Sequence, residues 1–281
     1  MEHEPREKIP TVIALEWNSR IPYKKEREDS LVVDEEHKIF VVADGVARLK
    51  NEKGEYPYPS PARMASRVAA EAMAEALRDD QTHIKKAFEK GNEAVKKLNE
   101  ELGLWDKHDY LVNDFAGTVG AAATEKDGVI EYGYIGDCGV AHFSASGELL
   151  YHSDDDVAAA RPGFPPMEGE PAFAKASEKV NERFIKVRRD FRNNLTASHK
   201  TFGVLTGEEA ALEYVKMGSL KYSSGDVIVV YSDGILPFVL EDMEFQKLLL
   251  AGNEEEIRKY IDERSSEKEY YDEKTIIVLR K

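Results

Sequence analysis

The stretch DSLVVDEEHKIFVVADG, residues 29–45, decides the fold. Two apolar runs flank a polar turn, and this pattern predicts a β-hairpin. Both open ends of the hairpin carry acids: Glu28 and Asp29 lie at the start of the first strand, and Asp44 lies at the end of the second. Because a hairpin brings its open ends together, we expect these three carboxylates to be neighbours.

Further strands and helices occur in separate blocks. Strand patterns cover residues 11–17, several short segments within 117–152, residues 226–234 and the C-terminal DEKTIIVLRK (272–281). Short turns join the segments within 117–152, which predicts antiparallel neighbours in a meander. Strands and helices in separate blocks predict an α+β fold, in which antiparallel sheets pack together and helices cover them.

The helical patterns begin with two long helices. Ser60 is a suitable N-cap for the first, which runs over residues 60–77, and Thr82 is expected to cap the second. Since the link between them is short, the two helices should lie antiparallel. Further helices are expected within GEEAALEYVKMG (207–218) and at 241–251 and 253–264.

Residues 153–200 depart from this regular pattern. They begin with three aspartates (154–156), and they end in NERFIKVRRDFRNN (181–194), a basic run in an acidic protein. We expect a flap or small subdomain outside the main core, within a single domain of residues 1–281. Two interpretations of the basic run remain open: a docking surface for an acidic or phosphorylated partner, or a solvated helix face.

Composition excludes several classes of protein. The 281 residues include 39 Lys and Arg against 54 Asp and Glu, a net charge of −15, which argues against nucleic acid or an anionic membrane as a partner. The single cysteine, Cys138, excludes a disulfide framework. The polar N-terminus and the lack of a long apolar run favour a cytoplasmic location by default. The oligomeric state is not predicted.

Acidic residues recur where predicted strands end or begin. Asp44-Gly45 and Asp233-Gly234 each end a strand, Asp137 follows a third strand, and Asp272 precedes the last one. Hard divalent ions such as Mg²⁺ and Mn²⁺ prefer oxygen ligands, and several carboxylates that converge without a cation repel one another. The pattern therefore favours a metal site, although Gly136-Asp137 is also good turn chemistry.

These motifs, in this order, resemble those of the metal-dependent protein phosphatases, the protein phosphatase 2C family. The segments that carry the resemblance are EREDSLVVDEEHKIFVVADG (26–45), AGTVGAAAT (116–124), YGYIGDCG (132–139), GDVIVVYSDG (225–234) and DEKTIIVLRK. The resemblance implies a β-sandwich of two antiparallel sheets flanked by pairs of antiparallel helices.

The resemblance also implies a metal site with two Mn²⁺ or Mg²⁺ ions. Asp44 would bridge them, with the Gly45 carbonyl on one ion and Asp233 and Asp272 on the other. Asp137, together with Asp233, would hold a weaker third ion.

The remaining acids and the substrate arginine complete the implied site. Glu28 and Asp29 match an acidic pair, one member of which orients metal-bound water. Lys24 occupies the place of the family's phosphate-binding arginine and offers a point charge in place of a guanidinium fork. Arg189 or Arg192, from the basic run, is a candidate to supply the missing guanidinium.

The implied activity is hydrolysis of phosphoserine and phosphothreonine in proteins by a water that two metal ions activate. Two other departures from the family pattern lie near the site: Val46-Ala47-Arg48 replaces a glycine pair, and Gly136-Asp137-Cys138-Gly139 retains only the acid of its motif. Two alternatives therefore stay open. One is an inactive pseudophosphatase that serves as a regulatory or binding module, and the other is a phosphatase of small phosphoesters.

Overall fold

The computed structural model describes residues 11–18, 26–46, 57–81, 83–111, 113–166, 178–265 and 272–281. Two five-stranded sheets have the orders β1-β10-β9-β6-β7 and β2-β3-β4-β5-β8. Neighbouring strands are antiparallel throughout both sheets. The strands are β1 Thr11–Trp17, β2 Ser30–Asp34, β3 Ile39–Gly45, β4 Thr118–Lys126, β5 Val129–Ile135, β6 Gly139–Phe143, β7 Leu149–His152, β8 Lys216–Lys221, β9 Val227–Tyr231 and β10 Lys274–Arg280.

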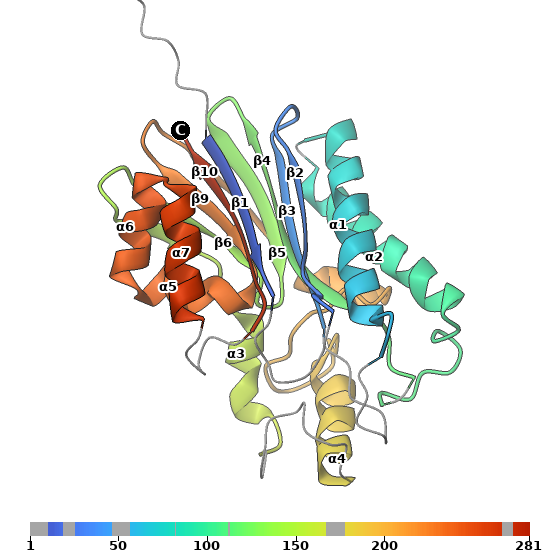
Figure 1. Ribbon diagram of the computed structural model, residues 1–281. Helices are drawn as coiled ribbons and strands as arrows, with labels where there is room; N and C mark the ends of the chain where they lie inside the picture. Colours follow the sequence, from blue (N-terminus) through green and yellow to red (C-terminus); the bar gives the residue numbers. More distant parts are fainter. Residues whose placement is uncertain are drawn as a thin grey trace, which may run out of the picture.

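The two sheets pack face to face around a central apolar core (Figure 1). Phe40 and Val42 of β3 contribute to this core from one sheet, and Val230 of β9 and Ile277 of β10 contribute from the other. The predicted hairpin is confirmed, since β2 pairs with β3 from Ser30↔Ala43 to Asp34↔Ile39. The predicted α+β sandwich of antiparallel sheets is confirmed as well.

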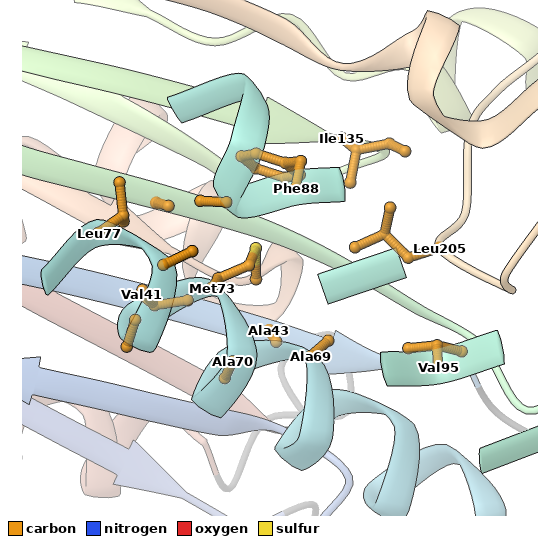
Figure 2. Close-up of a cluster of buried hydrophobic side chains, with 14 of the residues drawn as sticks. Val41, Ala43, Ala69, Ala70, Met73, Leu77, Phe88, Val95, Ile135 and Leu205 are labelled. Carbon is orange, nitrogen blue, oxygen red and sulfur yellow. The ribbon is translucent and has the colours of Figure 1, made fainter. Parts of the chain in front are cut away.

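Helices cover the outer face of each sheet. The helices α1 Pro61–Asp79 and α2 Ile84–Glu101 pack on the β2-β3-β4-β5-β8 sheet, and Figure 2 shows their apolar side chains over Val41 and Ala43 of β3. Ser60 caps α1 as expected, and its hydroxyl accepts a hydrogen bond from the Arg63 amide. The expected cap Thr82 lies outside the described residues, and His83 occupies the N-cap position of α2.

The other sheet is covered by three helices near the C-terminus. These are α5 Leu236–Glu241, α6 Met243–Ala251 and α7 Glu254–Arg264, whose apolar side chains form a third buried cluster with β1, β9 and β10. The helices at 241–251 and 253–264 were expected, whereas α5 was not. No helix in the described part of the chain is both long enough and apolar enough to span a bilayer.

The predicted meander through 117–152 is wrong at one turn. β5 belongs to one sheet and β6 to the other, so the chain crosses between the sheets at Gly136-Asp137. Gly136 has a φ of +79°, and a Cβ at this position would overlap the Val119 side chain. A glycine is therefore needed for this sharp crossing. The crossing places Asp137 between the ends of the two sheets.

The expected helix within 207–218 is only partly present. A 3₁₀ helix covers Glu209–Tyr214, and the chain then enters the edge strand β8, Lys216–Lys221. The residues of β8 alternate between half-buried and exposed, which is the period of a strand with one covered face. Pairing with β5 therefore overrides the helical pattern.

Residues 153–200 contain short helical segments at one end of the sandwich. They are α3 Asp156–Ala160, the 3₁₀ turn η1 Arg161–Gly163, α4 Glu178–Lys186 and the π-helical turn η2 Val187–Phe191. The expectation that this segment lies outside the main core is wrong at Ala160 and Phe191, because both are buried in the cluster between the sheets. Its description as a flap subdomain stays a prediction.

Candidate metal and phosphate site

The acids at the strand ends meet at one end of the sandwich. Asp44 lies near the end of β3 opposite Val119, Asp233 follows β9 at the start of a 3₁₀ turn (Asp233–Ile235), and Asp272 precedes β10. These three residues, with Asp137 and Gly45, line one cavity of about 320 Å³. The strand-end acids that the sequence singled out thus line the same cavity.

Much of the wall of this cavity comes from the segment 153–204, and Val46 and Val119 complete it. Val157 of α3, Phe164 after η1 and Val187 of η2 contribute apolar surface. The cavity thus has an acidic floor from the sheets and an apolar wall from the short helices.

Three of the floor carboxyls, those of Asp44, Asp137 and Asp233, resist ionisation. Burial raises the pKa of Asp44 well above its usual range, and the charges of Asp29, Asp233 and Asp137 add to the effect. Burial and the Asp272 charge raise the pKa of Asp233 to about 6. Burial also raises the pKa of Asp137, with a contribution from Asp233. A divalent cation would remove this conflict, so the donor set suits one.

These carboxyls do not have the arrangement of a metal site. Among the described residues, no group of three or more His, Cys, Asp or Glu side chains is arranged to hold a metal ion. The charges of Asp29 and Asp233 instead add to the effect of burial on the pKa of the Asp44 carboxyl. The assignment of Asp44, Gly45, Asp233, Asp272 and Asp137 as ligands stays a prediction.

The raised pKa values predict how stability depends on pH when no metal is bound. The pKa of Asp29 and of Asp233 is about 6 in the folded protein, against an ordinary value of 3.8. The folded state therefore holds these protons at a pH where the unfolded state has lost them. Their stabilising contribution is complete below pH 3.8 and is lost as the pH rises through 6.

We expect the free energy of unfolding in chelator to fall by about 3 kcal/mol over this range. One carboxyl with this pKa shift contributes about that amount. The contributions of Asp29 and Asp233 do not simply add, because the Asp233 charge is itself one cause of the raised pKa of Asp29. Urea unfolding at several pH values, with chelator and with Mn²⁺, measures it. Mn²⁺ should reduce the loss. A flat profile in chelator would contradict the described carboxyl cluster.

Asp29 joins the two sheets at the site. Its buried carboxylate accepts hydrogen bonds from Ser232 Oγ (2.8 Å) at the end of β9 and from Thr275 Oγ1 (2.7 Å) in β10. Its neighbour Glu28 is also buried and accepts a hydrogen bond from the Ser60 hydroxyl at the start of α1. The acidic pair thus holds the start of β2 against the opposite sheet and against α1.

Glu273 is a site residue that the sequence reasoning missed. It is buried, it lines the cavity, and its Oε2 accepts the backbone N–H groups of Glu28 (2.5 Å) and Asp29 (3.0 Å). The feature of the sequence that could have identified Glu273 is its position directly after Asp272. Glu273 fixes the backbone that presents the acidic pair, and its charge contributes to the raised pKa of Asp29 after burial.

Gly45 is required by close packing. A Cβ at this position would lie 2.5 Å from the Ala62 carbonyl oxygen and 3.0 Å from the Glu28 carbonyl oxygen. Thr118 Oγ1 also donates a hydrogen bond to the Asp44 carbonyl oxygen (2.6 Å), which fixes the end of β3. The Asp-Gly pair is therefore held rigidly between the start of α1 and β4.

Two of the three candidate phosphate-binding cations, Arg189 and Arg192, are described, and neither lines the cavity. Arg192 is buried, and its two terminal nitrogens donate to Asp114 at 3.0 and 2.7 Å, so its assignment to the substrate phosphate is wrong. Arg189 is exposed and pairs with its neighbour Asp190 at 2.7 Å. Lys24 lies outside the described residues.

Solved structures of similar fold come from bacterial phosphatases. The Mycobacterium tuberculosis serine/threonine phosphatase PstP/Ppp has a TM-score of 0.64 at 16% identity, with 97% of this chain and 99% of that chain covered. A serine/threonine phosphatase of S. agalactiae has a TM-score of 0.62 at 15% identity, with coverages of 96% and 99%. The catalytic domain of PstP with two manganese ions has a TM-score of 0.61 at 15% identity, with coverages of 96% and 97%.

The sandwich and its helical layers share the fold of these solved phosphatases. The family model for protein phosphatase 2C matches residues 19–266, and the chain therefore belongs to this family. None of the curated proteins matches the sequence.

Proposed function

We propose that this chain hydrolyses phosphoserine and phosphothreonine in proteins, with two Mn²⁺ or Mg²⁺ ions bound in the acidic cavity. The observation that carries the proposal is the meeting of Asp44, Asp137, Asp233 and Asp272, from distant parts of the chain, around one cavity. Membership of the family supports a phosphatase. The neighbour with two manganese ions supports the choice of metal.

Each residue of the site has a proposed part. Asp44, the Gly45 carbonyl, Asp233 and Asp272 would hold the two ions, and Asp137 would hold a weaker third. When bound, the ions supply an activated water and take up negative charge on the phosphoryl oxygens. Carboxylates on strand ends keep a fixed geometry, because the scaffold behind them is rigid.

The surrounding hydrogen bonds serve to hold this geometry. Glu273 fixes the backbone of Glu28 and Asp29, and the Asp29 carboxylate is held by Ser232 and Thr275. Asp29, whose charge contributes to the raised pKa of Asp44, would orient a metal-bound water.

The first test is metal dependence. With Mn²⁺ or Mg²⁺, the protein should hydrolyse an aryl phosphate and phosphoserine peptides, and excess chelator should lower the rate at least about 100-fold. Restoring activity by added Mn²⁺ controls for damage by the chelator. Turnover that is indifferent to chelator would overturn the proposal.

A second candidate function is a pseudophosphatase that serves as a binding module. It is favoured by the lack of a three-ligand metal cluster among the described residues and by the departures at Lys24 and Val46-Ala47-Arg48. Calorimetry with Mn²⁺ separates the two candidates. Divalent ion binding together with turnover supports the enzyme, whereas binding of a phosphopeptide without turnover at any metal concentration supports the module.

A further inference from the structure

The apolar wall of the cavity has no part in the proposed phosphate chemistry. More than half of the described residues that line the cavity are valine or phenylalanine. A phosphoryl dianion gains from cations and hydrogen-bond donors, and a hydrocarbon surface offers neither. The wall is therefore left to contact another part of the substrate.

The wall has a half-buried part and a buried part. Val157 of α3, Phe164 after η1 and Val187 of η2 are half-buried. Phe202 and Val204, which also line the cavity, are buried. A half-buried side chain keeps apolar surface that a bound group can cover. Val157, Phe164 and Val187 are therefore the wall residues that gain most from a ligand.

Contacts behind the wall hold it in place without a ligand. The Phe164 ring packs edge-on against the Phe191 ring, with centroids 4.9 Å apart, and lies 5.8 Å from the Phe202 ring. Arg183 Nε donates to the Pro165 carbonyl oxygen (2.8 Å), which ties the loop after η1 to α4, the helix that leads into η2. A wall that is already ordered loses little conformational entropy when it binds a ligand.

The charge of the lining favours an apolar ligand over an acidic one. Among the described residues, no lysine or arginine lines the cavity. The floor carboxyls would repel acidic groups of a substrate other than the phosphoryl group that the metal ions hold. An apolar group instead gains free energy when it leaves water and packs against the wall.

The geometry of an extended peptide sets the position of that apolar group. Side chains two positions apart point to the same side of an extended backbone, about 7 Å apart, whereas adjacent side chains point to opposite sides. Floor and wall line one cavity of about 320 Å³. A phosphorylated residue over the floor therefore brings the residues two positions away, and not its direct neighbours, over the wall.

We propose that Val157, Phe164 and Val187 form an apolar subsite that selects phosphoproteins with an apolar residue two positions from the phosphorylated serine or threonine. This inference rests on the proposed phosphatase function and names the substrate class of the same site. The occupant is a side chain of the substrate itself, because the subsite is continuous with the floor that would hold the phosphoryl group.

Three phosphoserine peptides of equal length and charge test this inference with the Mn²⁺-loaded full chain. The first has leucine two positions before and after the phosphoserine and serine at the adjacent positions. The second has these leucines and serines exchanged, and the third has serine at all four positions. We expect kcat/KM to be about tenfold higher for the first peptide than for the third, which is typical of a small apolar group in a hydrophobic pocket. The second peptide should resemble the third, which separates contact with the wall from a general affinity for apolar peptides.

Valine-to-threonine substitutions change the polarity of the wall and keep its shape, because threonine replaces one methyl group with a hydroxyl. Val157→Thr and Val187→Thr should each lower the preference for the first peptide over the third about threefold, since a ligand would then bury that hydroxyl. Phe164→Ser should nearly abolish the preference, whereas Phe164→Leu should retain most of it. The matched control is Val68→Thr, at a half-buried valine of α1 that packs on the outer helical layer and does not line the cavity. It should keep the wild-type preference.

The outcomes separate the subsite from the function on which it rests. Equal kcat/KM for the three peptides, or an equal gain from leucine at the adjacent positions, overturns the subsite and leaves the phosphatase in place. A preference that Val157→Thr, Val187→Thr and Phe164→Ser all leave unchanged also overturns it, because the selectivity would then come from another surface. If the wild-type protein hydrolyses none of the peptides with Mn²⁺, the proposed function fails and the inference fails with it.

Discussion

Asp44→Asn is expected to lower kcat for an aryl phosphate by about 10³-fold or more while the protein keeps its fold. In the proposed site, the Asp44 carboxylate would hold the metal ions, and an amide provides one neutral oxygen in its place. Loss of even one preorganised charge-stabilising group typically costs about 10²–10³ in kcat. Steady-state kinetics with saturating Mn²⁺ measures the effect.

The same substitution should stabilise the metal-free protein against unfolding. Asp44 lies against the carboxyls of Asp29 and Asp233, and repulsion contributes to its raised pKa after burial. A neutral amide removes that repulsion, so the variant should unfold at a higher urea concentration than wild type in chelator near pH 7. If the variant lost activity because it misfolds, it would instead unfold at a lower urea concentration than wild type.

Asp127→Asn is a matched control, since Asp127 is exposed in the turn between β4 and β5. It should change neither kcat nor the urea midpoint. If Asp44→Asn hydrolyses the aryl phosphate at close to the wild-type rate, the ligand assignment is wrong.

Local patterns in the sequence were enough to predict the layers of this fold. The alternation of apolar runs and turns within 29–45 specifies its own hairpin, because both strands and the turn are contiguous. The acids were found for a related reason: Asp44, Asp233 and Asp272 all lie at strand ends, and the strands themselves have strong apolar patterns. Their common location then follows from the sandwich.

Two other features, both of which depend on contacts between distant segments, were not predicted. The turn Gly136-Asp137 has the composition of a tight link, but that composition does not say whether the next strand joins the same sheet or the opposite one. Glu273 was missed because its partners are backbone amides at Glu28 and Asp29, which carry no signal in the sequence.

The role of Arg192 was wrong for the same physical reason. The run from Arg183 to Arg192 is rich in basic residues, but these residues have different surroundings. Arg192 is buried against Asp114, 78 positions away, whereas Arg189 is exposed beside Asp190. Only the fold distinguishes a buried ion pair from a solvated charge.

The buried cluster around Asp114 predicts the largest loss of stability. The Asp114 carboxylate accepts hydrogen bonds from Arg192 at 2.7 and 3.0 Å, and it also lies 3.0 Å from Arg188 Nε and 3.2 Å from His108 Nε2. Burial alone would raise the pKa of Asp114, but the Arg192 charge and the His108 hydrogen bond hold it well below its usual range. Asp114 is therefore a carboxylate that compensates two buried guanidinium groups.

Asp114→Ala should lower the free energy of unfolding by about 3–5 kcal/mol, because removing one partner of a buried ion pair leaves the other charge uncompensated. Urea unfolding measures the loss. Asp106→Ala, at an exposed position of the same loop, is the control and should change stability by less than about 0.5 kcal/mol. A loss below about 1 kcal/mol for Asp114→Ala would mean that water compensates both arginines.

The location of this cluster also predicts a loss of activity. Arg188 belongs to η2, and η2 begins with the cavity-wall residue Val187. Asp114 lies just before β4, which pairs with β3 up to the Asp44-Gly45 end. The ion pairs therefore hold the wall of the cavity against the strands that carry its floor. Under conditions where Asp114→Ala stays folded, kcat/KM for phosphopeptides should fall, whereas Asp106→Ala should keep the wild-type value, because only the first substitution releases the wall.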